Sequence, residues 1–282
     1  MPKQDNKEKT MSCLGKKMRM GKLFDAKSGN TVIIPMDHGV EGYFEELQSP
    51  KELVRILAAA GANGFLTRRG LAATAGDAFA GAGWVQRITG RSGIAVSRET
   101  KLDNDQLFIA SVEQAIRNGA DCVVPTVFFG GPQESTVLPG LGAVSDKCQE
   151  WGLPIMMEVF PIGDDDAVPY NGPYTLEDMR VAVRIAAEEG ADCIKTWYSG
   201  DPKSFRQIVS YAYVPVLIAG GPKAENSRQV LEMVKGAMDA GARGTTVGRK
   251  IWQSPNPGSM VRAVSMIVHE GADVDRALRV LN

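Results

Sequence analysis

Lys195, at the end of a short apolar segment, is the residue of this chain best placed to do chemistry. The stretch from Gly190 to Pro202 predicts a buried strand that ends in a Ser-Gly-Asp-Pro turn. Burial disfavours the ammonium form, so a lysine in such a strand tends to lose its proton near neutral pH. Because a neutral amine forms Schiff bases with carbonyl compounds, Lys195 is our candidate nucleophile.

Polar side chains end two other apolar segments. Asp37 and His38 end the first, where they could handle protons or bind hydroxyls, although taken alone they are more typical of a loop cap and a packed, neutral, hydrogen-bonded ring. Glu158 and Phe160 share one face of a later segment, because side chains of a strand alternate between its faces. A carboxylate there is either a general acid or base beside the amine, or the partner of a buried basic residue.

Glycines and cations follow the last two apolar segments. Gly220, Gly221 and Lys223 follow one of them, and Gly248 and Arg249 follow the other. Phosphates bind at such places in α/β barrels, because small residues expose backbone N–H groups and cations neutralise charge. Either loop alone fits a tight turn with a solvent-facing cation, but the two together favour a phosphorylated ligand. An amine facing a phosphate site indicates carbon–carbon bond chemistry on a phosphorylated ketone or aldehyde, with no metal or other cofactor.

From residue 31 onward, short apolar strands alternate with stretches long enough for crossover helices. This alternation predicts parallel βαβ units, and eight of them predict an α/β fold, a single (β/α)8 TIM barrel over residues 23–282. A Gly-Ala pair introduces every second strand, where glycine is the expected end of the preceding helix. The predicted strands are Thr31–Asp37, Gly64–Thr67, Gly93–Ser97, Cys122–Thr126, Ile155–Val159, Cys193–Thr196, Val216–Ala219 and Gly244–Val247.

The composition is that of an ordinary globular protein. The chain has 282 residues, of which 44% are hydrophobic and 23% charged, with a formal net charge of -1. This balance gives no reason to expect nucleic-acid binding, and no apolar run is long enough to span a bilayer. Four cysteines without a close-spaced pair and only two histidines argue against disulfides and against a zinc site of three imidazoles. A reducing cytoplasm fits this cysteine usage.

Residues 1–22 form a basic N-terminal arm. Lysine and arginine predominate there, and the apolar core of a signal peptide is missing. We expect a solvated or partly disordered arm. The alternative is an arm that contacts a neighbouring subunit.

Four blocks of sequence resemble a known family. The chain resembles the class I aldolases that include archaeal-type fructose-bisphosphate aldolase, aminodideoxyheptulosonate synthase and the thiolase of phosphorylated autoinducer-2. The likeness runs from about residue 21 onward and is densest in Met36–Gly39, Lys195–Pro202, Pro215–Lys223 and Val247–Gln253. The resemblance implies a homo-oligomer, Lys195 as the Schiff-base lysine, Asp37 as the active-site aspartate, and Gly220, Gly221, Gly248 and Arg249 in the phosphate loops.

One block departs from the family pattern. Many of these aldolases read Tyr-Pro-Arg-Gly after the fifth strand, with the tyrosine as general acid or base, whereas this chain reads Phe160-Pro-Ile-Gly163. Phenylalanine cannot move a proton, so Glu158, Tyr198 or a bound water takes over, and we favour Glu158. The departure weakens the case for fructose 1,6-bisphosphate as the substrate more than the case for Schiff-base chemistry.

Three functions therefore compete. The favoured one is a class I aldolase acting on a phosphorylated sugar or ketone. In the second, a transferase or thiolase on the same scaffold, Lys195 moves protons and forms no covalent intermediate. The third is a phosphate-binding barrel without aldolase activity, such as an isomerase or a binding protein.

Overall fold

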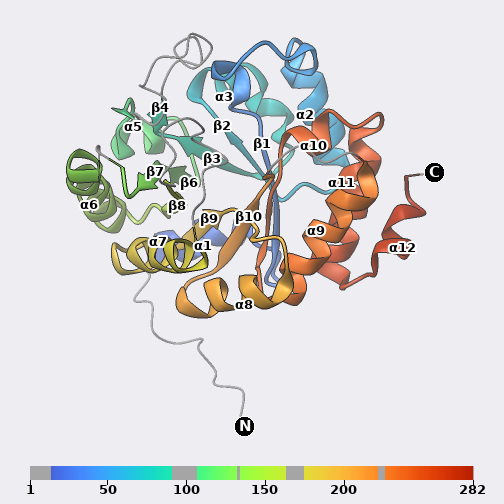
Figure 1. Cartoon of the computed structure of the whole chain (residues 1–282). Coiled ribbons are helices and arrows are strands. Elements are labelled where there is room, and N and C mark those ends of the chain that lie inside the picture. The colour runs from blue at the N-terminus through green and yellow to red at the C-terminus, as the bar shows by residue number, and fades with distance from the viewer. Residues whose placement is uncertain (1–13, 91–106, 132–133, 163–174, 222–225, 282) are drawn as a thin grey trace.

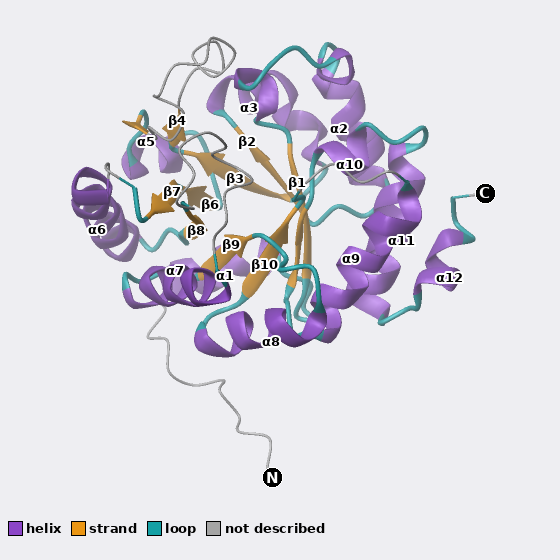
Figure 2. Ribbon diagram, viewed as in Figure 1, coloured by secondary structure: helices purple, strands orange, loops and turns teal. Residues whose placement is uncertain are grey.

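The computed structural model of the chain describes residues 14–90, 107–131, 134–162, 175–221 and 226–281. Parallel strands form a barrel that helices surround, as predicted (Figures 1 and 2). Hydrogen bonds order the strands as β6-β3-β2-β1-β11-β10-β9-β8-β7. The strands of this sheet are β1 (Thr31–Pro35), β2 (Gly64–Thr67), β3 (Gly83–Arg87), β6 (Cys122–Val124), β7 (Thr126–Phe129), β8 (Met156–Pro161), β9 (Cys193–Thr196), β10 (Val216–Ala219) and β11 (Gly244–Thr246).

Strands β6 and β7 together close the barrel. They are consecutive segments on either side of Pro125, which cannot donate a backbone hydrogen bond. β6 pairs with β3, whereas β7 pairs with β8. The two segments thus act as the fourth of eight strand positions, which agrees with the predicted (β/α)8 architecture.

The helices begin and end at residues that the sequence marks clearly. Helix α8 begins after Asp201, whose carboxylate accepts hydrogen bonds from the backbone N–H groups of Lys203 and Ser204. Helix α11 ends at Gly271, which has φ +70°. Among the described residues, no helix is long and apolar enough to cross a membrane. The helices are α1 (Leu14–Leu23), α2 (Pro50–Ala59), α3 (Arg69–Ala75), α5 (Val112–Arg117), α6 (Glu134–Trp151), α7 (Leu176–Glu188), α8 (Pro202–Tyr211), α9 (Ser227–Asp239), α10 (Arg249–Trp252), α11 (Pro257–Glu270) and α12 (Val274–Leu278).

The third barrel strand is not the predicted one. β3 spans Gly83–Arg87 and pairs with β2 and β6, whereas the predicted segment, Gly93–Ser97, lies outside the described residues. β3 also follows a Gly-Ala pair, and its Gly81 has φ +90°, so this signal is not confined to every second strand. The prediction was wrong because Gln86 and Arg87 make the end of this strand polar, and a more apolar run lies nearby.

Helix α1 closes the bottom of the barrel. Leu23 at its end is fully buried with inward-facing residues of β1 to β3. The side chain of Lys16 forms an ion pair with Asp192 at 2.8 Å, and that of Lys22 pairs with Asp121 at 2.7 Å. Residues 14–22 of the basic arm therefore belong to a docked helix, in contrast to the solvated arm that we expected there.

Candidate active site

Inward-facing positions at the carboxyl ends of the strands bring four charged side chains together. Lys195 on β9 lies opposite Glu158 on β8 in the register, and Glu158 lies opposite Thr126 on β7. Arg87 ends β3 two residues after Val85, an inward-facing core residue. A barrel gathers the ends of its strands at one mouth, and we define the site there by Asp37, Arg87, Glu158 and Lys195.

These side chains form a chain of alternating charges. The ammonium of Lys195 pairs with Oε1 of Glu158, while the guanidinium of Arg87 bridges Oε2 of Glu158 and Oδ2 of Asp37. The Thr126 hydroxyl donates a hydrogen bond to Oε2 of Glu158 at 2.6 Å. Each charged side chain is at most 10% exposed. Burial is tolerated because every charge has an oppositely charged neighbour.

The two carboxylates stay ionised in the resting site. Burial by itself would raise the pKa of Glu158, but the Arg87 guanidinium and the Lys195 ammonium outweigh it and lower the pKa to about 2. Burial opposes a similar depression of the Asp37 pKa, in which Arg87 again has the largest lowering effect. The sequence predicted a neutral lysine from burial alone, and this was incomplete because a carboxylate contacts the amine. The carboxylate of Glu158 is therefore placed to exchange a proton with the Lys195 amine.

His38 lies beside Asp37, and its Nδ1 has no hydrogen-bond partner in the described part of the chain. The Nδ1 atom is 3.6 Å from Oδ1 of Asp37, and burial lowers the pKa of the ring. The ring packs edge-on against Trp252 and Phe44, with centroid distances of 5.7 and 6.4 Å. The packing of the ring agrees with the simpler of the two interpretations drawn from the sequence, but the hydrogen bond that this interpretation includes is missing at Nδ1 among the described residues.

The two glycine loops lie side by side at the mouth. Ala219 pairs with Thr246 at the ends of β10 and β11, and Gly220 and Gly248 follow these residues closely. A Cβ on Gly248 would come within 2.6 Å of the Pro35 carbonyl oxygen, so the glycine is needed for packing as well as for any ligand. These contacts bring the two predicted loops together.

The remaining residues predicted for these loops are Gly221, Arg249 and Lys223. Gly221 has φ +60°, a conformation that glycine adopts without strain. Arg249 is half exposed and lies 3.9 Å from Glu41. Lys223 lies outside the described residues.

The two aromatic candidates lie in different surroundings. Phe160 is buried and stacks on Trp197 with a centroid distance of 4.2 Å. Tyr198 packs edge-on against Phe205 of α8, and a Cβ on Gly236 of α9 would come within 2.5 Å of its hydroxyl. Tyr198 thus faces the surrounding helices and does not join the charged cluster. Its proposed catalytic role is corrected, because its side chain packs against Phe205 and beside Gly236 instead of beside Lys195.

Sequence reasoning missed Arg87 and Thr126. Arg87 escaped notice because the third strand was placed too late in the chain. The Gly81-Ala82 pair was the available signal, since the same pair precedes four of the predicted strands. Thr126 was included in a predicted strand, but its partner depends on the register with β8, which the sequence does not reveal.

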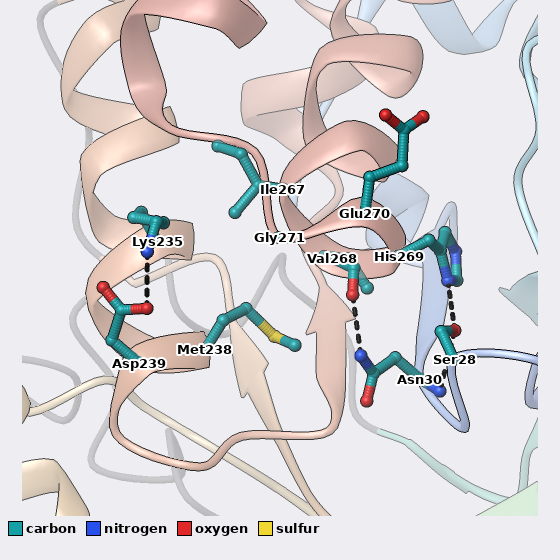
Figure 3. A pocket seen from close by; sticks show the side chains of 10 residues that line it. All are labelled: Ser28, Asn30, Lys235, Met238, Asp239, Ile267, Val268, His269, Glu270 and Gly271. Carbon is teal, nitrogen blue, oxygen red and sulfur yellow. Dashed lines mark hydrogen bonds and ion pairs between the residues drawn. The ribbon is translucent and has the colours of Figure 1, made fainter.

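A pocket lies at the end of the barrel opposite the charged cluster. Its volume is about 390 Å³. Figure 3 shows its lining residues at the ends of α9 and α11 and in the turn before β1. Ser28 shares a hydrogen bond with Nδ1 of His269 at 2.8 Å, and the Asn30 amide donates to the Val268 carbonyl oxygen. This pocket is separate from the charged cluster, because it adjoins the amino ends of the strands.

A barrel with a buried lysine among carboxylates at its mouth is the arrangement of a class I aldolase, and the chain is an enzyme of this class. Comparison with known families identifies it further. The DeoC/LacD family aldolase model matches residues 31–254, and the chain belongs to this family.

Two similar proteins and one solved structure support this assignment. An uncharacterized aldolase of Saccharolobus solfataricus is 31% identical over 275 residues, which cover 95% of this chain and 99% of the relative. The 2-amino-3,7-dideoxy-D-threo-hept-6-ulosonate synthase of Halobacterium salinarum is 32% identical, covering 95% of this chain and 97% of that protein. A solved Schiff-base-forming fructose-1,6-bisphosphate aldolase is 30% identical with a TM-score of 0.76, covering 90% of this chain and 99% of the other. The resemblance seen in the sequence is confirmed.

Proposed function

We propose that this aldolase forms or breaks a carbon–carbon bond in a phosphorylated sugar or related ketone, through a Schiff base on Lys195. The observation that carries the proposal is the ion pair between Lys195 and Glu158 at the mouth of the barrel. Glu158 is a proton acceptor in contact with Lys195. Among the four described residues that define the site, Lys195 carries the only amine. The adjacent glycine loops after β10 and β11 support a phosphate on the substrate.

The geometry supports a sequence of proton transfers through one carboxylate. The Lys195 ammonium gives a proton to Oε1 of Glu158, and the amine adds to the substrate carbonyl carbon. A proton moves from the attached nitrogen to the former carbonyl oxygen, which gives the neutral carbinolamine. Its hydroxyl then takes the proton held by Glu158 and leaves as water, which gives the iminium. Loss of the ammonium charge removes one of the two cations that lower the pKa of Glu158, so the carboxylate becomes a better acceptor at that moment.

Cleavage follows from the electron demand of the iminium. The hydroxyl on the carbon beyond the scissile bond loses a proton, the aldehyde leaves, and the electron pair of the broken bond enters the iminium to form an enamine. Protonation and hydrolysis of the enamine release the ketone and restore Lys195. Phe160 cannot accept the hydroxyl proton, so Glu158 is the acceptor that we assign to this step as well.

Borohydride trapping tests this proposal. The protein is incubated with dihydroxyacetone phosphate, reduced, and digested for mass spectrometry. We expect an adduct on Lys195 in the wild type and none at this position in Lys195→Met. An unmodified Lys195 under conditions of turnover would overturn the proposal.

The same ion pair favours one other function. A lysine in contact with a carboxylate is also arranged to shuttle protons, as a transferase or thiolase on this scaffold would require. Turnover without a trapped adduct would select this function. A homo-oligomer and a cytoplasmic location stay predictions, and sedimentation velocity would check the first.

A further inference from the structure

Aromatic rings form the layer of side chains between the Lys195–Glu158 pair and the mouth of the barrel. Side chains two residues apart on a strand share a face, so Phe160 points inward as Glu158 does. Trp197 has the same relation to Lys195 and directly follows the end of β9. Phe128 lies opposite Phe160 in the register of β7 with β8. Because parallel strands all run towards the mouth, these rings lie roughly 7 Å further along the strands than the ion pair.

This layer is tightly packed. Phe160 stacks on Trp197 with ring centroids 4.2 Å apart, and the rings of Phe160 and Phe128 are 5.7 Å apart. None of the three residues is more than 8% exposed. The rings are therefore held in place before a ligand arrives, and phenylalanine has no polar side-chain atom to offer it.

Ile162 extends the apolar surface by one more layer. Its backbone N–H donates to the Phe129 carbonyl oxygen at 2.8 Å, which continues the pairing of β8 with β7 beyond Pro161. Ile162 therefore follows Phe160 on the inward-facing side, where a Cβ on Gly131 would collide with its side chain. We call this surface the apolar wall, and its members are Phe128, Phe160, Ile162 and Trp197.

The proposed mechanism brings one fragment of the substrate to this wall. Glu158 takes the proton of the hydroxyl that becomes the aldehyde oxygen, so the aldehyde carbon lies within reach of Glu158. Below that point, Met156 and Cys193 are fully buried in the interior of the barrel. Towards β3, the guanidinium of Arg87 occupies the other oxygen of Glu158. The remaining substituent of the aldehyde therefore extends towards the mouth, along the apolar wall.

We propose that the aldehyde released or accepted by this enzyme is apolar, with an alkyl or aryl substituent that carries no hydroxyl beside the wall. A hydroxyl buried there loses its hydrogen bonds to water and gains none from Phe128, Phe160 or Ile162. An alkyl or aryl group gains free energy by leaving water at the same place. This assignment rests on the proposed function, because that function places the aldehyde oxygen at Glu158. The phosphate belongs to the ketone fragment on Lys195.

The synthetic direction gives a direct measurement. Dihydroxyacetone phosphate forms an iminium on Lys195, and loss of its α proton to Glu158 gives the enamine. The enamine carbon attacks the aldehyde carbon, the new alkoxide takes the proton from Glu158, and water hydrolyses the iminium to release the product and the amine. Propanal and glyceraldehyde compete as acceptors because they differ only by two hydroxyls, and glyceraldehyde 3-phosphate is the third acceptor. Mass spectrometry of the products at saturating dihydroxyacetone phosphate gives kcat/KM for each.

We expect the wild type to prefer propanal over glyceraldehyde by about tenfold or more. Phe160→Tyr adds a hydroxyl to the wall that pairs with those of glyceraldehyde, so the preference should fall by a similar factor. Ile162→Thr makes the same kind of change at a half-buried position, and tests the wall even where Phe160→Tyr fails to fold.

Phe44→Tyr is the matched control. Phe44 is half-buried and packs edge-on against Trp252, away from the wall, so the added hydroxyl should leave the preference unchanged. A wild type that uses glyceraldehyde or its phosphate as well as propanal would overturn the proposal. So would a preference that survives both wall substitutions, one that Phe44→Tyr lowers equally, or trapping of dihydroxyacetone phosphate on Lys195 without product from any of the three aldehydes. Absence of the trapped adduct is a different result, because it overturns the proposed function itself.

Discussion

The two carboxylate oxygens of Glu158 have different partners. Oε2 is held by Arg87 and by the Thr126 hydroxyl, whereas Oε1 contacts only the Lys195 ammonium among the described partners. One oxygen therefore fixes the carboxylate, and the other is left to exchange a proton with the amine. This division explains how a single side chain can be both the partner of a buried basic residue and a general base, the two roles that the sequence left open.

Glu158→Gln should separate catalysis from binding. The amide keeps the size of the side chain but cannot accept the lysine proton, so we expect turnover to fall by roughly 10²- to 10⁴-fold. Binding of dihydroxyacetone phosphate should change far less, because Glu158 is not placed at the glycine loops. Steady-state rates and calorimetry give the two quantities. Thr126→Val, which removes only the hydrogen bond to Oε2, is the milder control, and near-normal turnover in Glu158→Gln would remove Glu158 from the mechanism.

Arg87 is the residue on which the stability of the cluster depends most. Arg87→Met leaves two buried carboxylates without their shared cation, and we expect a loss of about 3–5 kcal/mol in the free energy of unfolding at pH 7. Arg87→Lys should lose less, since it keeps the charge but not the fork that bridges both carboxylates. Urea denaturation of both variants measures these differences.

The loss in the free energy of unfolding caused by Arg87→Met should become smaller as pH falls. In the wild type the folded-state pKa values of Glu158 and Asp37 lie below their unfolded values, so their pairing stabilises the protein above those unfolded values and is lost as pH falls through the folded ones. In the variant, burial acts without Arg87 and raises both pKa values relative to the wild type, so protonation relieves the negative charge that Lys195 alone does not balance. The difference between the two proteins should shrink from pH 7 to pH 5. A difference that is constant over this range would contradict the account.

At the scale of elements, the sequence predicted seven of the eight strand positions and failed at the third. The strongest signal in the sequence was a repeated Gly-Ala pair before strands such as β2, β9 and β11. The glycine of each pair has a positive φ. The failure at β3 came from treating apolarity as the mark of a barrel strand. The inward face of a strand at the mouth carries charged residues, so Arg87 made a true strand look like a loop.

The site was less predictable than the fold, for a physical reason. Asp37, Glu158 and Lys195 could be found because each ends or lies on an apolar segment. Their charge states depend on which cations and anions meet, and this follows from the register between strands. Tyr198 shows the same limit, since its distance along the chain from Lys195 does not reveal that it turns towards α8 and α9.

Helix α1 gives a prediction at this scale. Leu23 fills the bottom of the barrel against Gly64 and Gly83, where Cβ atoms would come within 2.9 and 2.6 Å of its side chain. Leu23→Ala should leave a cavity and lower the free energy of unfolding by about 2–5 kcal/mol. Leu14→Ala on the same helix is the control, because Leu14 is 74% exposed and should change stability by less than about 0.5 kcal/mol. Equal effects of the two substitutions in urea denaturation would show that α1 does not close the barrel.

At the scale of the whole molecule, His269 links helix α11 to the segments that precede β1 and β2. The ring lies in the last turn of α11, where Nε2 is 2.9 Å from Oδ1 of Asn63 and Nδ1 is 2.8 Å from the Ser28 hydroxyl (Figure 3). Asn63 Oδ1 also accepts the backbone N–H of Val32, so it is an oxygen, and Nε2 of His269 must donate to it. Nδ1 of the neutral ring is then an acceptor beside the Ser28 hydroxyl, whose single hydrogen goes either to Nδ1 or to Oδ1 of Asp25, each 2.8 Å away. A hydrogen-bonded neutral histidine thus contributes to the bottom of the barrel, beside the ion pairs of Lys16 and Lys22.

This network should make stability depend on pH near neutrality. Burial lowers the pKa of His269, although Asp25 and Glu270 act against the shift, so the unfolded chain binds more protons than the folded one as pH falls below about 6.5. Wild-type stability should therefore decrease from pH 7.5 to pH 5.5. His269→Gln keeps a donor and an acceptor but does not titrate, so its deficit relative to the wild type should narrow over the same range. Urea denaturation at the two pH values measures this, with trapping at Lys195 as the check that the distant mouth is intact. A deficit that stays constant would mean that His269 does not carry the pH dependence.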